Sequence, residues 1–244
     1  MPLSRRELKE DRVRTAFEDY EAFAKEHYKE IVAYVVIAIA VAGAVFGGKY
    51  YFGKADADAS TKLAAALDTF HAYVGPTSPE LAGSGMPTFP TDQEKYKKAL
   101  GQFRDVSDVA GVQKILPRLK AMRLAQYYAA LCTAQLGDDA SAIKTLEDSS
   151  HDSDANISSL AKFALAGEYL KTGKAQDATK IYLDLSDHPT DTVSRPTAML
   201  ALAGVYRGTQ PAQARQIYER LEKEYSSDAS LAAELKQQAS SIPQ

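Results

Sequence analysis

The sequence predicts an all-α protein in which one N-terminal transmembrane helix is followed by an α-solenoid of antiparallel helix pairs. Two observations carry this prediction: residues 31–48 contain no charged residue, and three similar segments recur between residues 118 and 225. A third observation is that the 244 residues include one cysteine and four histidines. With so few of these residues, neither a disulfide framework nor a metal centre is expected.

Residues 1–30 form a charged segment with the pattern of an amphipathic helix. Ser4 and Glu7 have the spacing of a capping box, in which each side chain accepts from the backbone near the start of a helix. Apolar residues then recur at intervals of three and four, which places them on one helix face: Val13, Phe17, Tyr20, Ala24, Tyr28 and Ile31. This helix either rests on a bilayer surface or docks against another membrane protein.

Residues 31–52 are predicted to form the transmembrane helix. The uncharged stretch 31–48 would be about 27 Å long as an α-helix, close to the thickness of one hydrocarbon core. A buried core helix would keep a polar stripe, and a secretory signal would have a shorter apolar region. An uncleaved signal anchor therefore fits better. Aromatic and lysine residues suited to the membrane interface flank the stretch: Tyr28, Lys29, Lys49, Tyr50, Tyr51, Phe52 and Lys54.

The basic residues near this helix favour a cytoplasmic N-terminus. Four lie in residues 11–30 (Arg12, Arg14, Lys25 and Lys29) and three in residues 49–68 (Lys49, Lys54 and Lys62). Since Lys and Arg are enriched on the cytoplasmic side, the difference of one charge places the C-terminal domain outside the cytoplasm. In a Gram-negative bacterium this is a single-pass protein of the inner membrane with a periplasmic domain.

Gly43 and Gly47 form a G-x-x-x-G motif within the predicted transmembrane helix. Small residues four apart allow two membrane helices to approach closely, so this face is a candidate contact for a homodimer. The other interpretation is that glycine is simply common in membrane helices.

The composition and motifs of the remaining chain argue against an enzyme or a nucleic-acid-binding protein. The whole chain of 244 residues has 29 basic and 32 acidic residues. It has no basic patch with interleaved aromatic residues, which a nucleic-acid-binding protein would need. No histidine pair has metal-ligand spacing, and neither a phosphate-binding glycine loop nor a nucleophile elbow is present. Cys132 lies in an apolar helical stretch and is expected to be a buried small hydrophobe. We expect no catalytic residue, metal or other cofactor.

Residues 55–117 are interpreted as linker helices around a loop. Helices are predicted over 55–74 and 93–110 from their apolar stripes. Between them, residues 75–92 contain four prolines and three glycines, a composition that neither a helix nor a strand tolerates.

Residues 118–225 contain three units, each an Ala/Leu-rich helix, a turn and a second helix. Gly137 and Gly173 are 36 residues apart, as are Ala142, Ala178 and Ala214. Each of these alanines is followed four residues later by a large side chain, respectively Leu146, Tyr182 and Tyr218. Four-residue spacing places both on one helix face, and a repeat of this length made of two helices is typical of a solenoid.

The middle unit resembles a tetratricopeptide repeat (TPR). The residues that match that consensus in type and spacing are Leu165, Ala166, Tyr169, Gly173, Ala178, Tyr182, Leu185 and Pro189. Residues 226–244 are predicted to form a C-terminal capping helix that begins at Asp228. A TPR-like domain implies binding to other proteins.

The whole chain resembles the YfgM-like family, ancillary subunits of the bacterial Sec translocon. The resemblance lies in the order of its parts: an opening SRRELKE, an apolar stretch after HYKE, a Lys49-Tyr50-Tyr51 exit and a TPR-like domain. It implies an adaptor at the translocon that passes emerging substrates to periplasmic chaperones. Sec translocon subunits, periplasmic chaperones or unfolded polypeptide are the implied partners. The alternative is a self-associating envelope scaffold in cell division or outer-membrane assembly.

In a TPR-like solenoid the first helix of each pair lines the concave face, where partners usually dock. The residues expected on that face are Tyr127, Leu131, Phe163, Leu170 and Leu200, with Lys171 and Arg207 at its margin. This mostly apolar groove suits an extended hydrophobic segment or an amphipathic helix. The alternative is that part of the stripe packs against the helices of residues 55–110.

Overall fold

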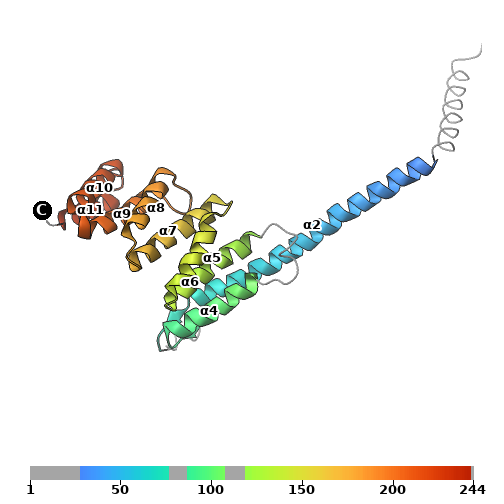
Figure 1. Ribbon diagram of the computed structural model, residues 1–244, viewed down its shortest axis with the longest axis horizontal. Coiled ribbons are helices and arrows are strands. Elements are labelled where there is room, and N and C mark those ends of the chain that lie inside the picture. The colour runs from blue at the N-terminus through green and yellow to red at the C-terminus, as the bar shows by residue number, and fades with distance from the viewer. Residues whose placement is uncertain (1–27, 77–86, 108–118, 243–244) are drawn as a thin grey trace, which may run out of the picture. The chain divides into compact units, whose positions relative to one another are not determined.

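The computed structural model describes residues 28–76, 87–107 and 119–242 (Figure 1). Within the first helix, the side chains of residues 28–35, 38, 51 and 52 are outside the description. The chain forms two compact units, Met1–Ala57 and Asp58–Gln244. The predicted helix of residues 1–30 falls almost wholly outside the described residues and stays a prediction.

Helix α2 (Tyr28–Phe70) runs through the apolar stretch and into the second unit. In the first unit, seven large apolar side chains among those that the structure describes are exposed: Val36, Ile37, Ile39, Val41, Val45, Phe46 and Tyr50. Over the described residues, no helix combines the length and the apolar character needed to cross a bilayer. The transmembrane helix predicted for residues 31–52 is therefore not found in the described part of the chain.

The second unit consists of helix pairs that pack in sequence order. After α4 (Asp92–Ser107) the pairs are α5 (Lys120–Gln135) with α6 (Asp139–Ser150), α7 (Ala155–Lys171) with α8 (Ala175–Asp187), and α9 (Arg195–Thr209) with α10 (Pro211–Glu224). Helix α11 (Ala229–Ser240) packs on α10. Each helix contacts its neighbour in the sequence (Figure 1). The prediction of an α-helical protein with TPR-like helix pairs is confirmed for this unit.

The alternation of small and large residues on the second helices explains how closely the pairs pack. Ala142, Ala178 and Ala214 are completely buried. The large residues four positions later are buried too, with Leu146 at 0% and Tyr182 at 4% exposed. A small side chain lets two helices approach, and the large one fills the space beside it. The predicted helix faces are therefore correct.

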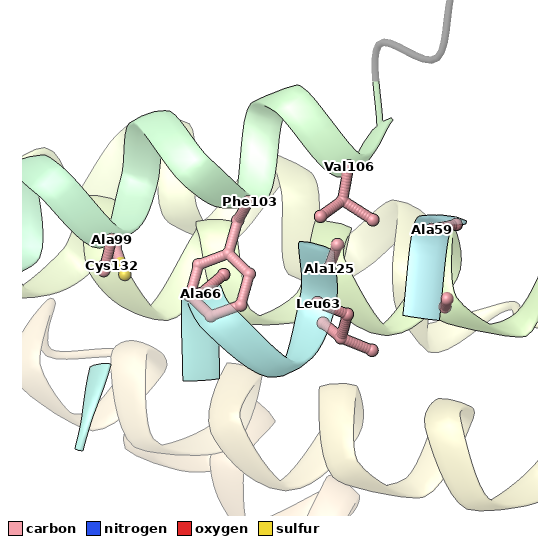
Figure 2. Packing of buried hydrophobic residues seen from close by; sticks show 9 residues of the cluster. Ala59, Leu63, Ala66, Ala99, Phe103, Val106, Ala125 and Cys132 are labelled. Carbon is pink, nitrogen blue, oxygen red and sulfur yellow. The ribbon is translucent and has the colours of Figure 1, made fainter. Parts of the chain in front are cut away.

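Helices α2 and α4 form a further helix pair, although the sequence predicts only linker helices for residues 55–117. Figure 2 shows Leu63 and Ala66 of α2 packed with Ala99 and Phe103 of α4 and with Cys132 of α5. Ala99 and Phe103 repeat the small–large spacing of the other second helices. Ala99 precedes Ala142 by 43 residues instead of 36, so the pattern lay outside the expected repeat length.

The segment between α2 and α4 contains a short parallel strand pair, which differs from the loop expected over residues 75–92. Strand β1 (Tyr73–Val74) pairs with β2 (Thr88–Phe89), and the Gly75 N–H donates to the Phe89 carbonyl at 3.0 Å. Gly75 has a φ of 146°, and a Cβ there would lie 2.9 Å from the Tyr73 ring. Two-residue strands are compatible with this composition because Pro90 lies just beyond the paired residues.

Turn and cap residues set the bounds of the repeat helices. Gly137 and Gly173 adopt φ values of 88° and 79° after α5 and α7, a conformation that favours glycine. The α9–α10 turn instead uses Pro211 as the first residue of α10. The Asp228 carboxylate accepts from the Ser230 and Leu231 N–H groups, both at 3.1 Å, so the predicted cap of α11 is confirmed.

Candidate protein-interaction surface

Polar contacts hold the start of each first helix to the end of the same helix pair. Arg123 Nη1 donates to Asp152 Oδ1 at 2.6 Å, and Arg195 Nη1 donates to Glu224 Oε1 at 3.2 Å. In the middle pair a hydroxyl cluster takes this place, with Ser159 Oγ 2.7 Å from Thr190 Oγ1 and 3.0 Å from Thr192 Oγ1. These contacts orient the first helices, which carry the predicted binding residues.

Tyr127 is a core residue. Its side chain is 8% exposed and packs with Ala130, Leu146 and Ala161. Burial raises the pKa of its hydroxyl to about 12. The side chain is therefore not available to a ligand, and the groove predicted from sequence does not extend to this position.

The other four predicted apolar residues are half-buried. Leu131 packs on the core between the α5–α6 pair and α7, whereas Phe163 and Leu170 pack on the next core along the chain. The Phe163 ring meets the Tyr182 ring edge-on, with centroids 5.4 Å apart. Leu200 packs on the core of the last pair. Each side chain thus has one side in the core and part of its surface in solvent.

Arg207 is exposed, but its guanidinium is bonded within the chain. Nη1 donates to Gln238 Oε1 at 3.3 Å and Nη2 to Ser241 Oγ at 2.9 Å. Arg215 also reaches this end of α11, where Nη2 donates to the Ile242 carbonyl at 2.6 Å. Cations stabilise the C-terminal end of a helix, so both arginines hold α11 in place. The sequence predicts Arg207 only at the groove margin, because no local pattern indicates that α11 packs within its reach.

Lys171, the other cation expected at the margin, is paired with a buried carboxylate. Its Nζ lies 2.6 Å from Glu168 Oε1. The Glu168 side chain is 8% exposed, and Oε2 has no hydrogen-bond partner within the described part of the chain. A buried charge needs a compensating partner, and Lys171 supplies it for the Glu168 carboxylate.

Two glycines leave the backbone of α7 and α9 uncovered by a side chain. Gly167 on α7 and Gly204 on α9 occupy the position of Leu131 on α5, 36 and then 37 residues further on. Gly167 is half-buried and Gly204 is exposed, and an added Cβ would meet no atom within 4 Å at either. Glycine inside a helix costs about 1 kcal/mol relative to alanine. Glycines within otherwise Ala/Leu-rich helices are therefore a sequence signal for this surface.

Phe163, Gly167, Leu170, Leu200 and Gly204 are called the α7–α9 strip below. All five are half-buried or exposed. The strip is thus the accessible surface of the predicted binding face on α7 and α9, and Leu131 on α5 is half-buried as well.

Gly43 and Gly47, the predicted membrane-helix contact, lie on the exposed part of α2. A Cβ at either position would have no atom within 4 Å. The contact between two membrane helices through these glycines stays a prediction.

The described residues offer no metal site and no reactive thiol. They contain no group of three or more His, Cys, Asp or Glu side chains that could hold a metal ion. Cys132 is completely buried, and burial raises its thiol pKa to about 12, so the thiolate is disfavoured. The expectation that the chain is not an enzyme stays a prediction.

Comparison with known proteins leaves the family open. No family model matches the sequence, and no curated protein matches it. Two solved structures are similar, both of putative kinesin light chain TPR-like repeats from Podosopora anserina. The first is 18% identical with a TM-score of 0.43, covering 62% of this chain and 89% of that chain. The second, a point variant of the same repeats, is 19% identical with a TM-score of 0.44, covering 60% of this chain and 80% of that chain. The TPR-like description therefore rests on the helix pairs themselves.

Proposed function

We propose that this protein is an adaptor that binds other polypeptides through the α7–α9 strip of its TPR-like domain. The proposal rests on two observations. Phe163 and Leu200 are half-buried, with one side of each side chain packed on the core. Gly167 and Gly204 have free space around the position of an added Cβ. Side chains held on one side by the core need little ordering when a ligand arrives, which lowers the entropic cost of binding. Glycines on the same face allow a ligand backbone to approach closely.

The character of the strip favours an apolar ligand over an acidic one. The cations of α7 and α9 are each already bonded within the chain: Lys162, Lys171, Arg195 and Arg207. A ligand carboxylate would have to compete with those internal contacts. An extended hydrophobic segment, or the apolar face of a partner helix, needs no free cation. Unfolded polypeptide fits this requirement.

Attachment to a membrane through residues 31–52 is the second part of the proposal. The support is the uncharged stretch 31–48 together with apolar side chains that are 57–76% exposed between Val36 and Tyr50. Consecutive residues are about 100° apart around a helix, so Val36, Ile37 and Ile39 point to different sides. A partner on one side would leave some of them in water, whereas lipid surrounds a helix.

The charge bias supports an orientation with the N-terminus in the cytoplasm and the C-terminal domain outside it, which is the periplasm in a Gram-negative bacterium. A reporter fused after Gln244 should be active only outside the cytoplasm, and one fused before Met1 only inside. Cytoplasmic activity of the C-terminal fusion would contradict this orientation.

The resemblance to the YfgM-like family supports a place at the Sec translocon. The order of a charged N-terminal segment, an apolar stretch and a TPR-like domain is common to both. Under this proposal the adaptor binds translocon subunits and passes emerging polypeptide to periplasmic chaperones.

Co-purification of the full chain in mild detergent tests both binding and partners. The wild type should retain translocon subunits or chaperones, and Phe163→Ala combined with Leu200→Ala should reduce their recovery at least several-fold. Leu183→Ala is the matched control, because Leu183 is 42% exposed on α8 outside the strip. Equal recovery by the double variant would reject the strip as the binding surface. Loss of helicity in that variant would show that the two residues serve the core. Homodimers without translocon subunits would favour the envelope scaffold instead.

A further inference from the structure

We draw no further inference here: the strongest candidate, the face of α2 on which Ala40, Gly43, Ala44 and Gly47 lie among exposed apolar side chains, is an unpartnered small-residue face, and nothing among the described residues shows what covers it.

Discussion

Arg123 and Arg195 stand 72 residues apart, two repeat lengths, and each donates to a carboxylate 29 residues further along the chain. The same contact therefore closes the first and the third helix pair of the 118–225 repeats. The two ion pairs differ in burial. The side chains of Arg123 and Asp152 are 21% and 12% exposed, whereas those of Arg195 and Glu224 are both 35% exposed.

The difference in burial predicts unequal contributions to stability. Asp152→Ala should lower the free energy of unfolding by about 1.5–3 kcal/mol, because it removes a charge-assisted hydrogen bond from the part-buried Arg123 guanidinium, which keeps its bond to Ser153. Glu224→Ala breaks a more solvated pair and should cost only about 0.2–1 kcal/mol. Urea denaturation of the two variants, followed by circular dichroism, measures both values. Similar losses would mean that burial does not set the strength of this repeated contact.

We predict that Arg207 stabilises the packing of α11 and does not bind a partner protein. Arg207→Ala removes the bonds to Gln238 and Ser241, so amide hydrogen exchange should accelerate across residues 229–242. Exchange in α5–α8 should be unchanged. Arg220→Ala, an exposed arginine of α10, is the control and should leave α11 protected. If α11 stays protected in Arg207→Ala while partner recovery falls, Arg207 belongs to the binding surface after all.

Gly204 allows the strip to be blocked without removing a core side chain. Gly204→Glu adds a charged side chain where a Cβ meets no atom within 4 Å, so the domain should keep its melting temperature within a few degrees. The carboxylate should obstruct an apolar ligand and reduce partner recovery at least several-fold. Gly101→Glu is the matched control, since Gly101 is an exposed helical glycine of α4 with equally open surroundings. Recovery that falls equally in both variants would point to a general charge effect and contradict a site at Gly204.

Several features of the fold follow from short-range pattern. Three alanines lie 36 residues apart, and each is followed four positions later by a large residue. This spacing predicts the buried face of the second helices, and these residues are buried. Gly137 and Gly173 marked turns that need a positive φ. Asp228 marked the start of the last helix. These assignments depend on the conformation of a few consecutive residues, which the local sequence largely sets.

The α2–α4 pair could not be recognised from the 36-residue repeat spacing. Ala99 and Phe103 carry the same four-residue pattern as Ala178 and Tyr182. The 12 residues 108–119 separate α4 from α5, whereas the four residues 151–154 separate α6 from α7, so Ala99 lies 43 residues before Ala142 instead of 36. An insertion in a turn leaves the helix contacts intact and removes the regular period. The packing in Figure 2 therefore identifies a pair that the period alone did not.

The sequence by itself determined the helix pairs of residues 118–225, their turns, the cap of α11 and the buried faces of α6, α8 and α10, because these depend on spacing within one or two helical turns. Only the tertiary structure decided which residues of the first helices remain accessible. Tyr127 and Phe163 occupy equivalent positions 36 residues apart, yet one is core and the other half-exposed. Arg207 is exposed, yet its guanidinium is bonded to Gln238 and Ser241 at the C-terminal end of α11. The exposure of a side chain depends on which helices pack beside it, and those neighbours come from distant parts of the chain.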